Sequence, residues 1–238
     1  MYGAVDFYDK AKTAGIKPII GCEVYVAVRT RFDKERIDLR SNHLILLCKN
    51  DIGYKNLIYM VSKSFTEGFY SKPRIDFELL KQHSEGLIGL SACLAGLIPS
   101  KLLARDYNGA KEAALLYSSV FEKDSFFLEL QDHGYSEEAV VKEGLLKISR
   151  ETGIPTVATN DVHYTKRKDA EIQNVLLCIG TNKTVNEDNP IAFKTKEFYL
   201  KSGDEMAQLF GREAVENTAK IADMCNFNFD FGNIKLPY

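Results

Sequence analysis

The sequence predicts an α/β fold, and three observations lead to this prediction. Short apolar segments of strand length alternate along the chain with longer segments that repeat apolar residues at helical spacing. No apolar run approaches the roughly 18 residues that cross a bilayer. Polar side chains that can bind metals gather near strand ends, where barrel enzymes build their sites. We therefore expect a barrel-like sheet rather than an open doubly wound one.

In the first half of the chain, the sequence predicts five elements in this order: a helix, two strands, a second helix and a third strand. A helix pattern opens the chain and stops at Gly15. Buried strands are expected at residues 16–28 and 43–50, with a polar loop between them. Residues 52–65 follow as a helix, because their apolar positions recur at helical spacing. The strand at residues 86–93 ends in small side chains.

The second half continues the alternation. Helices are expected at residues 108–121, 136–153 and 168–180, and strands at residues 125–134 and 154–164. The last fifty residues hold one or two further helices and a Phe-rich tail. This regular alternation is what assigns the chain to the α/β class.

Size and composition indicate one large domain. The chain has 238 residues, 45% hydrophobic and 27% charged, which is ordinary for a globular protein. We interpret 1–238 as a single domain, with a barrel core at 1–180 and a helical extension at 181–238. The formal net charge of −2 gives no general attraction to nucleic acid, although a local basic face remains open. Five scattered cysteines without a CxxC pair favour the reducing cytoplasm, and we expect no membrane partner.

Five side chains at or near strand ends can bind a divalent cation: Glu23, His43, Cys93, Asp161 and His163. Asp161 and His163 are two residues apart on an extended segment, so their side chains point to the same side. A carboxylate and an imidazole aimed at one point are suitable ligands for a divalent cation. These five residues are our candidate metal site.

Each of these residues also has an ordinary structural interpretation. Glu23 is compatible with a salt-bridged surface carboxylate, and His43 with a hydrogen-bonded residue at a strand boundary. Cys93, among small residues, is compatible with an inert core thiol. The pair of Asp161 and His163 is equally compatible with a polar strand end, because short motifs produce false matches.

Strand direction decides whether the candidate residues can meet. Glu23 lies late in its strand and His43 at the start of the next. In parallel neighbours these side chains would be separated by a strand length, on the order of 15 Å. A shared site therefore predicts that the two strands run antiparallel.

Five segments carry a family resemblance: GIKPIIGCEVYVA, EGFYSKPRID, GLIGLSACLAG, FFLELQDHG and IPTVATNDVHY. Together they resemble the PHP (polymerase and histidinol phosphatase) domain at the N-terminus of bacterial DNA polymerase III alpha subunits. The resemblance implies a distorted (β/α)7 barrel, which agrees with the antiparallel requirement. It also implies a metal cluster bound from several strand ends, with ligands at Glu23, His43, Cys93, Asp161 and His163.

The resemblance further implies phosphoester hydrolysis, as a 3′-to-5′ exonuclease that some members keep and others lose. Glu23 and Asp161 are the expected catalytic positions, because a carboxylate such as Glu23 can bridge two cations. The cofactors would be divalent zinc, manganese or magnesium, and a Cys93 thiolate favours zinc over magnesium. The implied partners are DNA, through the parent polymerase, and the other polymerase III subunits.

The chain departs from the family pattern at its start. The family's His-rich first strand and its Thr-Asp-His-Gly segment do not appear in the sequence. We therefore expect an N-terminally truncated barrel that lacks its first strand or strands, partial metal occupancy and weak or no exonuclease turnover. The sequence also contains no polymerising domains, so we expect the chain alone not to synthesise DNA.

Three further residues are candidates beyond the five ligands. Lys72 and Arg74 suit phosphate contacts, with a solvated basic turn as the alternative. His133 at a strand end is expected to support the ligands from behind. The competing functional hypothesis is a structural domain that packs against the polymerase body or a proofreading partner, and metal content separates the two. A free-standing PHP phosphatase is a weaker alternative.

Overall fold

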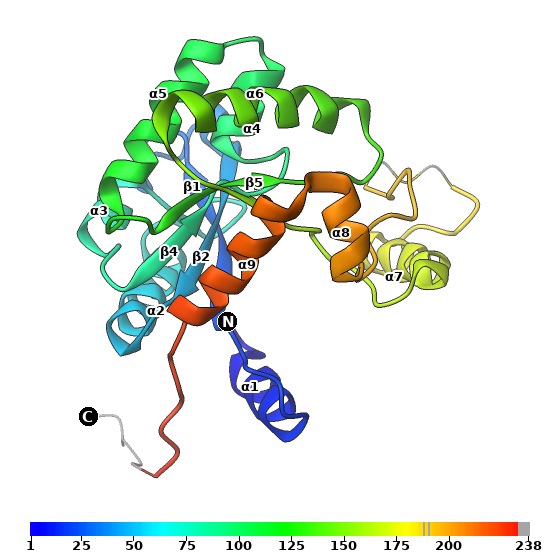
Figure 1. Cartoon of the computed structure of the whole chain (residues 1–238), viewed down its shortest axis with the longest axis horizontal. Coiled ribbons are helices and arrows are strands. Elements are labelled where there is room, and N and C mark those ends of the chain that lie inside the picture. The colour runs from blue at the N-terminus through cyan, green and yellow to red at the C-terminus, as the bar shows by residue number, and fades with distance from the viewer. Residues whose placement is uncertain (188, 190, 233–238) are drawn as a thin grey trace.

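A computed structural model describes residues 1–187, 189 and 191–232, and its centre is a six-stranded mixed sheet (Figure 1). The α/β class predicted from the sequence is confirmed. The strands lie in the order β3-β1-β2-β4-β5-β6. Their bounds are β1 Gly21–Ala27, β2 Ser41–Cys48, β3 Arg74–Ile75, β4 Leu87–Leu90, β5 Phe126–Leu130 and β6 Thr156–Ala158.

Helices occupy most of the segments between the strands and follow the last one. They are α1 Ala4–Thr13, α2 Asp51–Thr66, α3 Phe77–Gln82, α4 Leu97–Leu103, α5 Tyr107–Val120, α6 Ser136–Thr152, α7 Ala170–Thr181, α8 Gly203–Phe210 and α9 Arg212–Met224. Two short 3-10 helices lie at Arg36–Leu39 and Arg167–Asp169. The strand–helix alternation expected from the sequence is therefore present, with α3 and α4 as additional short helices.

The second strand runs against its neighbours. β2 is antiparallel to both β1 and β4, whereas the pairs β1–β3, β4–β5 and β5–β6 are parallel. The predicted antiparallel arrangement of the first two long strands is confirmed. Among the described strands the sheet ends at β3 on one edge and at β6 on the other, so these six strands do not close the expected barrel.

The two faces of the sheet bury different sets of apolar residues. On one face, Leu46 and Leu128 belong to the large core shared with the helices, and both are fully buried. The opposite face carries a smaller cluster that includes Phe127 and Val157 and is covered by Ile221 of α9. Figure 1 shows α9 lying across the sheet. The segment after residue 180 therefore contributes directly to covering the sheet.

Several helix starts follow from polar residues that precede them. Asn50, Asp76 and Asp106 each accept a hydrogen bond from a backbone N–H in the first turn of α2, α3 and α5. Such caps stabilise a helix by about 0.5–2 kcal/mol each. α6 ends at Gly153, whose φ of 75° is the left-handed conformation that glycine adopts without strain.

Across the part of the chain that the structure describes, no helix combines the length and the apolar character needed to cross a bilayer. All five cysteines lie in the described residues, and all five are unpaired. Cys48, Cys178 and Cys225 are buried, whereas Cys22 and Cys93 are half-buried. The half-buried thiol of Cys93 is therefore accessible to a ligand.

Candidate metal centre

The reversed direction of β2 brings together three candidate ligands from β1, β2 and the segment after β4. His43 lies near the start of β2 and pairs with Tyr25, while Glu23 pairs with Ile45. Glu23 and His43 are therefore diagonal neighbours on the same face of the sheet, within reach of each other. The backbone N–H of His43 also donates to the carbonyl of Ala95 at 3.0 Å, which places the loop after β4 beside it.

Glu23, His43 and Cys93 form a compact cluster. One ligand atom from each residue lies within 4.8 Å of the ligand atoms of the other two. His43 Nδ1 contacts the Glu23 carboxylate and lies 3.6 Å from Cys93 Sγ. Carboxylate oxygen, imidazole nitrogen and thiolate sulfur are the three ligand types that zinc accepts. The three side chains therefore fit a divalent cation such as zinc.

The cluster is strongly polarised. Hydrogen bonds to Cys93 and Glu23 raise the pKa of His43 to about 9. The hydrogen bond from His43 lowers the pKa of Glu23. The imidazolium thus provides a positive charge beside the Glu23 carboxylate. A bound cation would take over this role and release the proton, since metal ligands must be deprotonated.

Asp161 and His163 follow the last residue of β6 by three and five positions, and among the described residues they are not part of the compact cluster of Glu23, His43 and Cys93. His163 Nδ1 donates to the backbone carbonyl of Asp161 at 2.6 Å, which leaves Nε2 as the nitrogen for a ligand. Burial raises the pKa of Asp161, and the neighbouring charge of Glu23 raises it further. Conversely, the charge of His163 lowers the pKa of Glu23. The two groups of ligands therefore lie within electrostatic range of each other.

Two residues at the site have an unusual backbone. Ala92, directly before Cys93, has φ 62°, and Asp161 has φ 42°. Side chains other than glycine rarely adopt this left-handed region, which costs on the order of 1–3 kcal/mol and is frequent at functional sites. Both residues lie shortly after the end of a strand, Ala92 after β4 and Asp161 after β6.

Sequence reasoning missed Glu129, a carboxylate buried behind the site. It accepts hydrogen bonds from the backbone N–H of Ala92 and, at 2.8 Å, from the hydroxyl of Thr159. Burial raises the pKa of Glu129 to about 7. Glu129 thus links the loop before Cys93 to the loop before Asp161. The available signal was a single charged residue inside the otherwise apolar strand FFLEL.

His133 is buried and connects three parts of the site. Its Nε2 donates to the carbonyl of Asn160 at 2.7 Å, and its Nδ1 lies 2.5 Å from the Glu138 carboxylate. Its ring stacks on Phe198 with centroids 3.9 Å apart. Asn160 precedes Asp161, so His133 contacts the segment that carries this candidate ligand, and its supporting role stays a prediction.

Lys72 and Arg74 have different environments. Arg74 is 1% exposed, and its guanidinium donates to the backbone carbonyls of Asp38, Asp33, Gly68 and Arg31. The predicted phosphate contact of Arg74 is therefore wrong, because all of this side chain's donors face inward. Lys72 is exposed, lies 4.4 Å above the Tyr25 ring and lowers the pKa of Glu23. Its phosphate contact stays a prediction.

Comparison with known proteins identifies similar sequences. A family model described as the PHP domain matches residues 1–133. The DNA polymerase III subunit alpha of Treponema pallidum is 50% identical over 241 residues, and that of Borreliella burgdorferi is 48% identical over 242 residues. The corresponding subunit of Thermus aquaticus is 42% identical over 246 residues. Each alignment covers 100% of this chain but only 20–21% of the relative, so the chain spans about a fifth of their length.

Proposed function

Since the chain belongs to the PHP domain family, we propose that it is the PHP region of a DNA polymerase III alpha subunit and holds a metal-dependent phosphoesterase site of the 3′-to-5′ exonuclease type. One observation carries the proposal. The ligand atoms of Glu23, His43 and Cys93 lie within 4.8 Å of one another. A domain with only a scaffolding role has no need for such an arrangement.

The proposed ligands are Glu23, His43, Cys93, Asp161 and His163. Glu23 is proposed to hold a cation together with His43, and the contact of its carboxylate with His43 Nδ1 supports this. When bound, divalent cations would supply a clamp on the phosphodiester and charge stabilisation for its attacking and leaving oxygens. The thiolate favours zinc, and manganese or magnesium suits the carboxylates.

The protein's own groups would hold the substrate and the ligands in position. Lys72 is proposed to contact a phosphate oxygen beside the cluster, because its amino group is exposed and near Glu23. His133 would orient the strand end through Asn160. Asp161 and Glu23 are the proposed catalytic carboxylates, since their pKa values are shifted in opposite directions at one site.

The wider role follows from the relatives, which are polymerase subunits about five times as long as this chain. We propose that DNA and the other subunits of polymerase III are the partners of the full protein, which is a nucleotidyltransferase. The five unpaired cysteines support the reducing cytoplasm as its location. The alternative is a structural PHP domain that supports the polymerase or a proofreading partner.

The test combines metal analysis with a 3′-labelled single-stranded oligonucleotide. It compares the 238-residue chain, a form carrying the family's His-rich strand upstream, and Asp161→Asn in each. We expect both forms to bind zinc or manganese. The 238-residue chain should cleave slowly and the extended form faster, and Asp161→Asn should abolish cleavage in each form. Absence of stoichiometric metal from both forms, or cleavage that survives Asp161→Asn, would overturn the proposal in favour of the structural role.

A further inference from the structure

A cavity of about 410 Å³ lies directly beside the candidate ligands. Cys93 and Asp161 line part of it, so it adjoins both halves of the proposed metal site. Its volume falls within the range of about 300–1,000 Å³ that is typical of small-ligand sites. The cavity is therefore large enough for one nucleotide unit next to the cations.

The rest of the lining is aromatic and well supported. Tyr135 and Phe193 are half-buried and line the cavity above the buried Phe198. The ring centroids of Phe193 and Phe198 are 4.3 Å apart, and those of Tyr135 and Phe198 are 6.0 Å apart. The Tyr135 hydroxyl also accepts a hydrogen bond from the backbone N–H of Lys194 at 3.2 Å. These contacts hold the two rings in place before any ligand enters.

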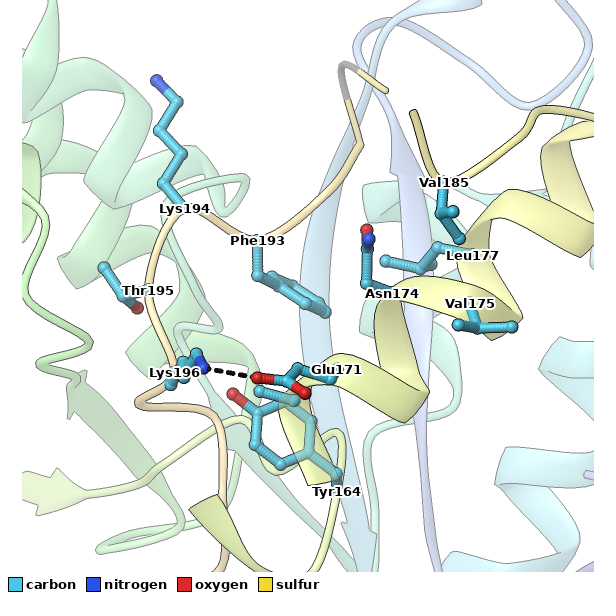
Figure 2. Close-up of a pocket in the computed structure, with 11 residues that line it drawn as sticks. Tyr164, Glu171, Asn174, Val175, Leu177, Val185, Phe193, Lys194, Thr195 and Lys196 are labelled. Atoms are coloured by element: carbon cyan, nitrogen blue, oxygen red, sulfur yellow. Dashed lines mark hydrogen bonds and ion pairs between the residues drawn. The ribbon is translucent and has the colours of Figure 1, made fainter. Parts of the chain in front are cut away.

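Phe193 forms a wall between this cavity and a second one. The second cavity, of about 470 Å³, lies against α7 and also includes Phe193 in its lining. Figure 2 shows the Phe193 side chain pointing toward Asn174 and Leu177, while Lys194 points away from the second cavity. An ion pair of Lys196 and Glu171 closes one side of the second cavity at 3.0 Å (Figure 2). Phe193 therefore packs against Phe198 and His163, with ring centroids 4.3 and 4.6 Å away, and the rest of this half-buried side chain lines the two cavities.

The charges around the first cavity favour one orientation of a nucleotide. At the aromatic end the exposed Glu137 and Lys194 line the cavity with opposite charges, and the buried Glu138 carboxylate is already bound to His133. The proposed cations beside Cys93 and Asp161 would attract a phosphate. In a nucleotide the phosphate and the base are joined through a single sugar, so a phosphate at the metals leaves the neutral base to the aromatic end.

We propose that this cavity binds the 3′-terminal nucleobase of single-stranded DNA, stacked on Tyr135 and Phe193. The inference rests on the proposed function and adds the group that holds the end of the strand. Aromatic side chains stack on every base without requiring a sequence, which suits a site that removes any terminal nucleotide. The occupant is thus a single unpaired base, and a paired duplex end does not fit the role.

The experiment measures binding without catalysis. Fluorescence anisotropy in EDTA compares a short single-stranded oligonucleotide with its counterpart that carries an abasic 3′ terminus. One stacked base contributes about 5- to 100-fold in affinity, so we expect a preference of that size for the intact end. A second probe carries 2-aminopurine at the 3′ end or three positions inside. The chain has no tryptophan, and we expect quenching only for the terminal position.

Matched substitutions locate the effect. Tyr135→Leu and Phe193→Leu should each reduce the preference for the intact end, whereas Tyr135→Phe and Phe193→Tyr keep a ring and should retain it. Urea unfolding checks that each variant folds. Equal affinity of the unsubstituted protein for intact and abasic ends, or leucine variants that fold and keep the full preference, would overturn the inference.

The result is separable from the proposed function. Asp161→Asn should abolish metal-dependent cleavage yet keep the preference for an intact end in EDTA. Metal-dependent cleavage without any terminal-base preference would overturn only the stacking site. A terminal-base preference without stoichiometric metal or cleavage would overturn only the phosphoesterase.

Discussion

At the residue scale, the candidate site depends on a few polar side chains whose neighbours set their chemistry. Glu23 and His43 hold each other in charged form, whereas Glu129 lies behind them without a cationic partner among its contacts in the described residues. The Glu23 carboxylate therefore lies beside a cationic side chain, whereas the Glu129 carboxylate accepts hydrogen bonds from the neighbouring loops. Their separate environments explain their different proposed roles.

Glu129→Gln tests this difference through the pH dependence of stability. The pKa of Glu129 rises from 4.5 to about 7 in the folded protein. Because the folded protein binds this proton more tightly than the unfolded chain, the contribution of Glu129 to the free energy of unfolding is fully present below pH 4.5. It is lost as the pH rises through 7. The rise corresponds to about 3 kcal/mol. We expect the metal-free wild type to lose about that much free energy of unfolding relative to Glu129→Gln between pH 4.5 and 8.

The measurement is urea unfolding of both proteins in EDTA across this pH range. The other titrating groups are common to both proteins and cancel in the difference. A difference that stays constant with pH would mean that Glu129 ionises in the folded protein as it does in water.

Cys93→Ser tests the choice of metal. Serine replaces a soft sulfur ligand by a hard oxygen, which lowers the affinity for zinc more than that for manganese. We expect zinc to bind about 10- to 100-fold more weakly, a loss at least as large as that from an outer-shell partner. Competition with a zinc chelator measures it, and cobalt substitution should lose its thiolate absorption band.

Cys22→Ser is the matched control. Cys22 and Glu23 are successive residues of β1, so their side chains lie on opposite faces of the sheet. It should leave both readouts unchanged. Equal effects of the two substitutions on zinc affinity would remove Cys93 from the ligand set.

At the scale of elements, the sequence predicted most strands and helices, but it did not predict which polar side chains are buried. Strand length and apolar spacing are local properties, so the strands around Glu23 and Val157 could be recognised. The antiparallel β2 was predicted only because Glu23 and His43 had to meet. Arg74 was misassigned because the burial of a side chain depends on which loops fold over it, and local pattern does not reveal that.

Arg74→Ala tests its structural role. Arg74 joins β3 to three backbone carbonyls in the loop after β1 and to the carbonyl of Gly68 after α2. Its loss leaves buried carbonyls without donors, at about 2–4 kcal/mol of the free energy of unfolding. Lys72→Ala, two residues away and exposed, should change stability by less than about 0.5 kcal/mol. Urea unfolding compares them. A stable Arg74→Ala protein with weakened DNA binding would restore the phosphate contact to Arg74.

At the scale of the whole molecule, the six-stranded sheet carries Glu23 and His43 on its interior strands β1 and β2, and α9 packs on the sheet. Phe127 and Glu129 lie on the same face of β5, since they are two residues apart. Phe127 packs in the cluster with Ile221 of α9, so the layer beneath the site is apolar. The helix nearest the end of the described chain thus supports the site from below.

Ile221→Ala should therefore destabilise the whole domain. Ile221 is 4% exposed in the cluster beneath the site, and such truncations cost about 2–5 kcal/mol. Ile179→Ala on α7 is the control, because Ile179 is 71% exposed and should cost less than about 0.5 kcal/mol. Urea unfolding followed by circular dichroism measures both. Equal stability of the two variants would show that α9 contributes little to the domain.

Crystallographic anomalous scattering at the zinc edge tests the central claim that the five ligands form one centre. We predict at least one zinc ion within about 2.0–2.3 Å of donor atoms of Glu23, His43 and Cys93. Asp161 or His163 should bind that ion or a second one about 3.5–4 Å from it. A zinc-loaded crystal without an ion at Glu23, His43 and Cys93, or with Asp161 and His163 remote from every bound ion, would contradict the account.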